Sequence, residues 1–464
     1  GEAPRRAWLE LNGQGETRRV CLYQTEEGGW QAVFYLDWAQ PEQLESAALL
    51  VQTENGWLRS GEVPLGQRCA EETMRERLNK AVVLQWAGVL ALYAVTARLL
   101  WRILQIQIAN PYAGDFLVHI QTALDPTQTG YSALNPVYQG LWALTGSYDS
   151  MVLFVLLMCL GGIAASGWFL HRYAGTGIFA SGLLGWCCFC ADPVYLPFLN
   201  DYRTLGVQAF GVWHNPTLIG IKLLGVFVLA LYLRMVRQFD EGLHWRDWLA
   251  FMVLLALATG VKPSLLFCFA PAMAVLMLWD FVRGRCQRFG RYVWLGCSVF
   301  PALAVVLSQY LVLFAGGPQQ HEESGLAFSL GANLLQRTQH PIASILQSAA
   351  FVLAVAVLCA GSLLRDRMLC MGWGMTGFAY LQHIFLVETG PRASDGNWTW
   401  GTSVSLFLLF LASAVRLWQQ TGRWKEQTPL RKGLICLCWL LLAWQSACGL
   451  EYMLLFIKNG TFYL

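Results

Sequence analysis

Residues 80–104 read KAVVLQWAGVLALYAVTARLLWRIL, and NPYAGDFLVH follows over residues 110–119. The first stretch is apolar and long enough to cross a bilayer, whose hydrocarbon core of about 30 Å needs roughly 20 residues of helix. Ten further apolar stretches follow, with approximate limits 150–171, 176–198, 214–234, 247–262, 264–282, 292–315, 342–364, 368–387, 401–418 and 433–456. The sequence therefore predicts a mainly α protein, a polytopic transmembrane bundle of about eleven spans within residues 80–464.

The composition agrees with a membrane protein. Of the 464 residues, 56% are hydrophobic and only 13% are charged, which is too apolar for a soluble chain of this length. The net charge of +3 is too small to indicate a nucleic-acid partner. Most of the 14 cysteines lie inside apolar runs and are expected to pack as small core residues. Cys21 and Cys69 lie outside these runs, and they can pair if their segment faces an oxidising compartment.

Residues 1–75 differ from the rest of the chain. Short alternating runs, such as those around Val20 and Val33, are separated by Gly-Gly, Asn-Gly and Ser-Gly turn signals. We predict a small β-rich accessory domain here, with a docking or structural role. The sequence opens on Gly1 rather than Met, which leaves open whether residues precede it and on which side of the membrane this domain lies.

Basic residues orient the predicted spans. They cluster before the first, seventh, ninth and eleventh spans, after the second, and between the fourth and fifth, and include Arg75, Arg77, Lys80, Arg172, Arg234, Arg237, Arg246, Arg283, Arg285, Arg288, Arg291, Arg365, Arg367, Arg416 and Lys432. All of them fall on one side if every span crosses, and the positive-inside rule makes that side cytoplasmic. Arg98 and Arg102, near the far end of the first span, oppose this assignment unless they snorkel to the interface. The break around Lys262 and Pro263 allows the fifth and sixth spans to be one broken helix or a re-entrant pair.

The loop over residues 105–149 is the longest on the opposite, extracytoplasmic side. Its runs around Val118 and Tyr138 are typical of amphipathic helices that lie in the membrane interface. Long loops with their own helices usually carry function. The sequence therefore directs attention to the polar residues of this loop and its neighbours.

Asp115 and His119 are the first candidate pair, and Tyr112 precedes them in the same stretch. Four residues apart on a helix, the carboxylate and the imidazole would share one face. Asp115 could act as a general base there, although an acid after Gly114 is also a common helix N-cap.

A second cluster runs from Asp201 and Arg203 to His214 and Asn215, at the start of the fourth span. His214 and Asn215 could bind a phosphate or a sugar, or simply cap the helix that follows, with Pro216 in its first turn.

Lys262 is the third candidate. A lysine between two apolar spans is costly unless it is paired or faces water, and the Pro263 break suits it to hold an anionic head group. The alternative is a lysine that snorkels to the interface.

Weaker candidates complete the set. The outer segments also carry Gln382, His383, Glu388 and Arg392, and a Gly- and Gln-rich loop carries His321, Glu322 and Glu323. No phosphate-binding glycine loop, nucleophile elbow or zinc signature occurs in the sequence.

This layout resembles the GT-C class of membrane glycosyltransferases. The resemblance covers roughly residues 80–460 and rests on the many spans, the long first outer loop, Gly114-Asp115 after the first span, and the Pro136 and Tyr138 segment before the second. His214 to Thr217 and Lys262 to Ser264 are similar to short outer-face motifs of bacterial members. The N-terminal β domain lies outside the resemblance.

The resemblance implies an inverting transfer of a sugar from a polyprenyl-phosphate carrier to a glycan, lipid or protein acceptor on the outer face of a bacterial plasma membrane. Asp115 would remove the acceptor proton, and Lys262, with Arg203 or His214, would stabilise charge on the leaving phosphate. His119 would orient Asp115 or bind the acceptor, and Asp201, Asn215, Tyr112, Tyr138 and Glu388 would belong to the substrate site. Membrane lipids are further expected partners, and the sequence leaves open whether a divalent metal takes part.

Two rival interpretations stay open. A surface-polysaccharide polymerase also joins lipid-linked sugars on the outer face, but it would use paired outer arginines, and Arg203, Arg337 and Arg392 are isolated in the sequence. A transporter or flippase of a lipid-linked solute would favour internal repeats and charges midway along the spans. We find no repeat, and the polar residues fall at span ends.

Overall fold

The computed structural model describes residues 6–13, 16–24, 30–31, 44–53, 56–60, 63–64, 71–127, 130–208, 211–312, 325–390 and 396–461. The chain divides into two units, Gly1–Leu84 and Gln85–Leu464. Predictions on Cys69, His321, Glu322, Glu323 and Arg392 lie outside the described residues, and the side chain of Cys21 is not described either.

The first unit holds an antiparallel sheet. Its strands are β1 (Arg6–Gly13), β2 (Glu16–Gln24), β3 (Trp30–Gln31), β4 (Leu44–Thr53), β5 (Gly56–Arg59) and β6 (Val63–Pro64). The order is β3-β2-β1-β4-β5, with β6 also paired to β4. Trp8 of β1 lies opposite Cys21 of β2 and Leu50 of β4, so β1 is a central strand. Arg59 binds the buried carboxylate of Glu10 through two hydrogen bonds of 2.9 and 2.6 Å, which ties β5 across β4 to β1.

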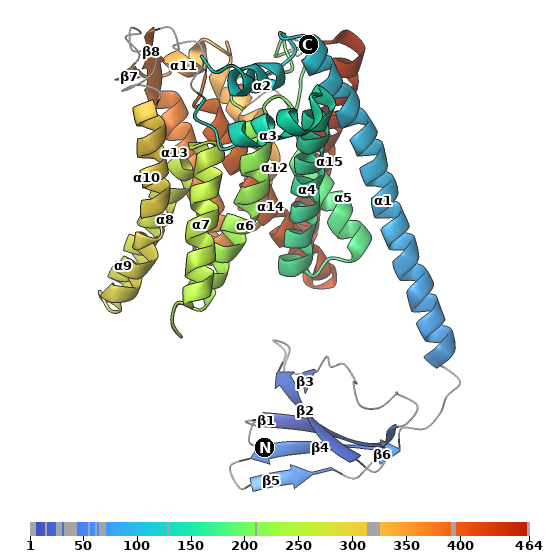
Figure 1. Cartoon of the computed structure of the whole chain (residues 1–464). Coiled ribbons are helices and arrows are strands. Elements are labelled where there is room, and N and C mark those ends of the chain that lie inside the picture. Colours follow the sequence, from blue (N-terminus) through green and yellow to red (C-terminus); the bar gives the residue numbers. More distant parts are fainter. Residues whose placement is uncertain are drawn as a thin grey trace. The chain divides into compact units, whose positions relative to one another are not determined.

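The second unit is a helical bundle (Figure 1). Its long helices are α1 (Glu71–Ala109, which begins in the first unit), α4 (Tyr148–Ala174), α5 (Ile178–Cys190), α6 (Pro216–Arg237), α7 (Trp245–Val261), α8 (Ser264–Arg283), α9 (Phe289–Cys297), α10 (Phe300–Tyr310), α12 (Pro341–Leu358), α13 (Arg367–Phe385), α14 (Thr399–Gly422) and α15 (Pro429–Asn459). Shorter elements lie in the connections: α2 (Phe116–Leu124), α3 (Asn135–Thr145), α11 (Ala332–Leu335), η3 (Leu363–Arg365), η5 (Trp424–Glu426), and the paired strands β7 (Gly325–Phe328) and β8 (Leu386–Thr389).

Eight segments among the described residues are long and apolar enough to span a membrane: residues 80–109 of α1, then α4, α6, α8, α9 with α10, α12, α14 and α15. The prediction of a multi-pass, mainly helical membrane protein is confirmed. The remaining three predicted spans correspond to α5, α7 and α13. α5 has 13 residues and α7 has 17. α13 is a continuous helix of 19 residues, but its three glycines, Gln382 and His383 lower its hydropathy. The predicted count of eleven is therefore not established by length and apolarity.

Helix α14 forms the centre of the bundle. In its most apolar stretch 94% of the residues are buried, compared with 11% for α1, which presents most of its surface outward. Small polar residues such as Thr402, Ser405 and Ser413 are fully buried along α14. Small side chains at helix contacts let neighbouring backbones approach closely, so α4, α6, α8, α12 and α13 can all pack against this helix.

The 105–149 loop folds into α2 and α3, where the sequence predicts two amphipathic helices. The Nε2 group of Gln139 on α3 donates to the Ala123 carbonyl of α2 at 2.8 Å, and Phe116 packs against the fully buried Tyr138. The segment before α3 is tied to the end of α7, because Ala133 N donates to the Gly260 carbonyl at 2.8 Å. Both helices lie at the end of the bundle where α7 ends and α8 begins (Figure 1).

Candidate functional site

A tight turn brings Asp115 to the segment that precedes α6. Gly114 has φ of +154°, and a Cβ at this position would lie 2.8 Å from the side chain of Gln107. Gln107 in turn donates to the Trp213 carbonyl at 3.1 Å, and Asp115 N donates to the His214 carbonyl at 3.1 Å. A residue without a side chain is therefore needed at 114 for the two segments to meet.

The carboxylate of Asp115 does not cap α2. Asp115 occupies the N-cap position, yet its side chain makes no capping hydrogen bond to the helix backbone. It accepts a hydrogen bond from Asn215 Nδ2 at 2.7 Å on one oxygen, and His214 Nε2 lies 3.5 Å from the other. The side chain keeps 37% of its surface exposed, so it remains accessible to a substrate.

Asn215 serves as cap and as donor at the same time. Its Oδ1 accepts from the backbone N–H groups of Thr217 and Leu218 at 2.8 and 3.3 Å, which caps α6. Because Oδ1 must face these donors, the amide orientation is fixed and Nδ2 must face Asp115. The predicted cap is therefore confirmed, and binding of a phosphate or a sugar by Asn215 stays a prediction, while its free donor is directed at Asp115.

The fixed amide also determines the protonation of His119. Asn215 Nδ2 lies 3.1 Å from His119 Nε2, and because Nδ2 can only donate, Nε2 must carry no proton. Burial, followed by the positive charge of Lys262, lowers the pKa of His119 to about 4. Burial likewise lowers the pKa of His214. Both imidazoles are thus neutral near pH 7.

Asp115 is ionised in this setting. Burial alone would raise its pKa, but His214 and His119 when protonated, the hydrogen bond from Asn215 and the charge of Lys262 together outweigh burial and lower the pKa below its ordinary value. With neutral histidines, the charges of this cluster near pH 7 are the carboxylate of Asp115 and the ammonium of Lys262.

Lys262 is buried between α7 and α8, with 4% of its surface exposed. Its backbone is extended, and its N–H donates to the Ala258 carbonyl, so it ends α7. Its Nζ donates to Thr217 Oγ1 at 3.2 Å and lies 4.3 Å from the centre of the Trp400 ring. A side chain held in this way does not snorkel to an interface.

A continuous hydrogen-bonded path joins the two charges. Lys262 donates to the Thr217 hydroxyl, the hydroxyl donates to Asn215 Oδ1 at 2.5 Å, and Asn215 donates to Asp115. Trp400 lies beside this path, because its ring stacks on His214 at 6.1 Å between centroids and also carries the cation–π contact with Lys262. We refer to Asp115, His119, His214, Asn215, Thr217, Lys262 and Trp400 as the relay cluster.

A cavity of about 200 Å³ lies against Lys262 and Trp400. Its lining includes Glu388, which accepts a hydrogen bond from Asn397 at 2.8 Å, and Asn397 in turn accepts from Trp400 Nε1 at 3.2 Å. The cavity thus combines a buried cation with aromatic and amide groups, a combination that suits an anionic group attached to a polar ring.

A larger groove of about 790 Å³ shares Tyr131 and Gln309 with this cavity. Gln309, on α10, holds this helix against the end of α7, since its Nε2 donates to the carbonyls of Thr259 and Gly260 at 3.1 Å. The groove runs between the α2–α3 connection and helices α7 and α10, and the exposed apolar side chains of Val253 and Leu257 line part of it. A groove open on the outside of the bundle, lined by apolar and polar side chains, thus adjoins the cavity that contains the buried lysine.

The remaining candidate residues from the sequence lie outside the relay cluster, either at the surface or in contacts that stabilise the fold. Arg203 forms a 2.6 Å ion pair with Glu451 on α15 and lies over the Tyr195 ring. Asp201 and Tyr112 are exposed, and Tyr138 is buried between Phe116 and Phe154. The structure therefore brings Asp115, His119, His214, Asn215 and Lys262 together, with Glu388 across the adjoining cavity.

Thr217, Trp400, Asn397 and Gln309 were missed in the sequence. Thr217 follows the N-cap of α6 by two residues, so a helix-cap argument could have placed it at the site. No local signal distinguishes Trp400 from the other 20 tryptophans of the chain.

Among the residues that the structure describes, no group of three or more His, Cys, Asp or Glu side chains could hold a metal ion. The relay cluster itself offers one carboxylate, one ammonium group and neutral hydrogen-bonding groups.

The fold and the site together define a multi-pass membrane protein with a charged site at one end of its helical bundle. No protein-family model matches the chain, and no curated protein shows significant sequence similarity to it.

Proposed function

We propose that this protein is a membrane glycosyltransferase of the GT-C type, which transfers a sugar from a polyprenyl-phosphate carrier to a hydroxyl group of an acceptor. The observation that carries the proposal is the path from Lys262 through Thr217 and Asn215 to Asp115. It holds an ionised carboxylate and an ammonium group in one site without pairing them directly.

The reaction needs both charges. The acceptor oxygen attacks the anomeric carbon, the bond from that carbon to the phosphate oxygen breaks, and the acceptor proton passes to Asp115. The polyprenyl phosphate leaves with the bonding electron pair and gains negative charge, which Lys262 stabilises. Attack from the face opposite the leaving group inverts the anomeric configuration.

The two hollows suit the two ends of such a donor. The groove along α7 and α10 is large and partly lined by exposed apolar side chains, as a polyprenyl chain requires. The cavity beside Lys262 is smaller and mostly apolar, and the Lys262 ammonium with the amides of Gln382 and Asn397 supplies the polar groups that a sugar phosphate requires. Because the hollows share Tyr131 and Gln309, a single lipid-linked molecule could occupy both.

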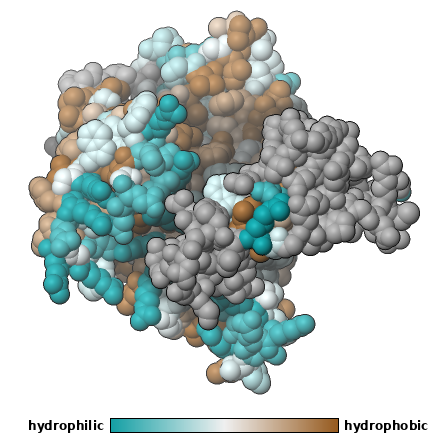
Figure 2. Space-filling model, turned by 90° about the horizontal axis from the view of Figure 1, so that it is seen from below, coloured by the Kyte–Doolittle hydropathy of each residue, from teal (hydrophilic) through white to brown (hydrophobic). Residues whose placement is uncertain are grey.

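The end of the bundle that carries the relay cluster is proposed to be extracytoplasmic. Arginine-rich segments such as those ending α6 and α8 lie at the other end, and Figure 2 shows hydrophilic residues gathered there. The positive-inside rule assigns that end to the cytoplasm. With α5, α7 and α13 added to the eight long apolar segments, the bundle has the eleven spans predicted from the sequence, and residues 1–75 form its accessory β domain.

A reconstituted transfer assay tests the proposal. The full-length protein in liposomes is supplied with a panel of polyprenyl-phosphate sugars and with membrane-extract acceptors, and new glycosidic bonds are measured. Asp115→Asn keeps the shape of the side chain and removes the base, so transfer should fall by roughly 10²–10⁴-fold while donor binding persists. Asp149→Asn, an exposed acid at the same end of the bundle, is the matched control and should transfer normally.

Full transfer by Asp115→Asn contradicts the role of Asp115. Movement of the lipid-linked sugar across the membrane without new glycosidic bonds contradicts the enzyme and favours the transporter instead. Repeated addition of one lipid-linked unit to a growing chain favours the polysaccharide polymerase.

A further inference from the structure

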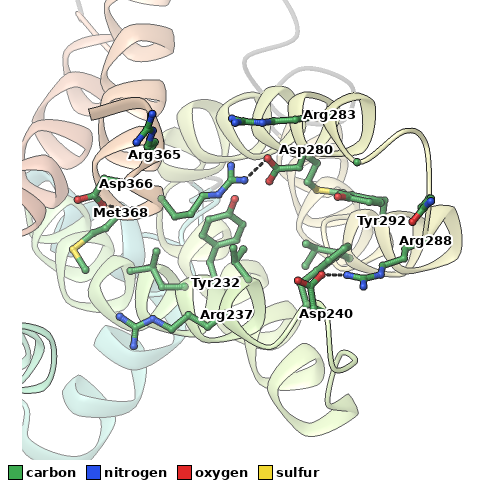
Figure 3. A pocket seen from close by; sticks show the side chains of 18 of the residues that line it. Tyr232, Arg237, Asp240, Asp280, Arg283, Arg288, Tyr292, Arg365, Asp366 and Met368 are labelled. Carbon is green, nitrogen blue, oxygen red and sulfur yellow. Dashed lines mark hydrogen bonds and ion pairs between the residues drawn. The ribbon is translucent and has the colours of Figure 1, made fainter. Parts of the chain in front are cut away.

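The opposite end of the bundle holds a second hollow of about 640 Å³, which we call the arginine pocket (Figure 3). It lies where α6 and α8 end and where α9 and α13 begin, with Arg416 of α14 also in its wall. Ligand pockets usually have volumes of roughly 300–1,000 Å³, so this one has room for a head group. None of its lining residues belongs to the relay cluster.

Three aspartates in the arginine pocket are each paired with an arginine. Asp240 pairs with Arg288, Asp280 with Arg367, and Asp366 with Arg416. The first two pairs are drawn as dashed lines in Figure 3. These contacts neutralise all the acids that line the pocket.

Three further arginines are left without an acid. Arg237, Arg283 and Arg365 come from α6, α8 and η3, and within the described part of the chain none of them forms an ion pair. Arg237 lies over the Tyr173 ring at 5.0 Å, a contact that leaves its charge uncompensated. The three guanidinium groups are exposed and give the lining of this hollow an excess of positive charge, which attracts an anion.

The turn from α8 to α9 shapes the pocket at a conformational cost. Arg285, Cys286 and Arg288 all have positive φ, between 55° and 59°. A residue with a Cβ is strained in this conformation. The turn is held by Arg291, which donates to the carbonyls of Phe239 and Asp240 at 2.6 and 2.8 Å, and this bonding keeps the loop after α6 against it.

Exposed apolar side chains neighbour pocket-lining residues in the sequence, although none of them lines the pocket itself. Trp279 and Val282 on α8 and Phe289 on α9 are each about 60% exposed, at 59%, 61% and 64%. In a membrane helix such a surface contacts acyl chains. A ligand whose charged group enters the pocket could therefore continue along this apolar surface.

We propose that the arginine pocket binds a phosphate group, presented as the head group of an anionic lipid. Arginine suits this ligand because its planar guanidinium donates two parallel hydrogen bonds to phosphate oxygens. Basic pockets between membrane helices bind lipid head groups in this way. A soluble phosphate compound shares the same chemistry, and the test separates the two sources.

Native mass spectrometry of the full-length protein in detergent measures binding of three probes. Phosphatidic acid carries the phosphate and the acyl chains, diacylglycerol carries the same chains alone, and glycerol 3-phosphate carries the phosphate alone. The expected result is binding of phosphatidic acid and none of diacylglycerol. The variant Arg283→Gln/Arg365→Gln alters exposed side chains and should weaken phosphatidic acid binding roughly tenfold, with a smaller loss for Arg237→Gln.

The matched control is Arg172→Gln/Arg423→Gln, which removes two exposed arginines outside the pocket and should bind as the unmodified protein does. Equal losses in the two double variants, or equal binding of diacylglycerol, would overturn the proposal. Displacement of phosphatidic acid by glycerol 3-phosphate at similar concentration would support the phosphate site but overturn its assignment to a lipid. Thermal unfolding of each variant, unchanged from the unmodified protein, establishes that a lost ligand does not reflect a lost fold.

Discussion

The carboxylates at the two ends of the bundle have different surroundings. In the arginine pocket, each aspartate contacts an arginine directly, so an adjacent positive charge balances its own. In the relay cluster, two neutral side chains, Asn215 and Thr217, separate Asp115 from Lys262. A carboxylate that is stabilised from a distance and remains 37% exposed can still accept a proton from a substrate.

The excess charge of the two ends differs as well. The relay cluster has one positive and one negative charge near pH 7, while the arginine pocket has three arginines beyond those its aspartates neutralise. The first arrangement suits a reaction in which charge moves, and the second suits the binding of a permanent anion. The predictions below test this difference, starting with the largest expected effect.

Among the predictions that follow, removal of the lysine should have the largest effect. Lys262→Met keeps a chain of similar length but leaves the departing phosphate without a cation, so kcat in the transfer assay should fall by roughly 10²–10³-fold. Lys458→Met, an exposed lysine near the end of α15, is the matched control. An equal rate for Lys262→Met and the unmodified protein would remove Lys262 from the reaction.

Replacement of Asn215 by an acid, which would repel the carboxylate of Asp115, should have a smaller effect on transfer. Asn215→Asp retains an acceptor that can cap α6, but it replaces the donor to Asp115 with a second acid. The pKa of Asp115 should then rise, and transfer at pH 6 should fall roughly tenfold, with more of the loss recovered at higher pH. Asn215→Ala removes the cap too and should lower stability by about 1 kcal/mol. An unchanged pH profile for Asn215→Asp would contradict the proposed role of Asn215.

The smallest expected effect is that of pH on the transfer rate of the unmodified protein. Because the pKa of Asp115 is lowered and that of His119 is about 4, the base stays ionised and His119 stays neutral from pH 8 down to pH 5, and burial also lowers the pKa of His214. Initial rates should therefore show no step near pH 6.5 and should decline only as the pH approaches 4. The donor is a phosphodiester and does not titrate in this range. A decline centred on pH 6.5 would mean that an ordinary histidine controls the rate.

The lowered pKa of His119 also affects the stability of the folded protein. A histidine whose folded pKa lies below its unfolded value binds a proton more readily when unfolded. His119 therefore contributes a loss of stability as the pH falls from about 6.5 to about 4, and thermal unfolding over that range measures it.

Much of the bundle could be predicted from the sequence, because an apolar run of sufficient length has few alternatives to a helix in a membrane. All eleven predicted runs contain a helix, and α2 and α3 lie where amphipathic runs occur. The ends of helices were harder to predict. The run 176–198 becomes helix only over Ile178–Cys190, and two prolines, Pro193 and Pro197, lie beyond that end.

The residues of the relay cluster could be selected one by one, but not their arrangement. Asp115, Asn215 and Lys262 each stand out locally, as an acid after glycine, a cap before proline and a lysine between apolar runs. Their meeting depends on Gly114, which permits a close approach to Gln107, and on the order in which the helices pack. Arg203 shows the limit of such reasoning, since it belongs to the same connection as His214 but turns to Glu451.

The most direct test is the position of the donor phosphate in an experimental structure of the protein reconstituted with a polyprenyl-phosphate sugar. The proposed function predicts phosphate density within about 3 Å of Lys262 Nζ, with the anomeric carbon between it and Asp115 and the lipid chain in the groove along α7 and α10. Donor phosphate in the arginine pocket instead, with the cavity beside Lys262 empty, would contradict the proposed function.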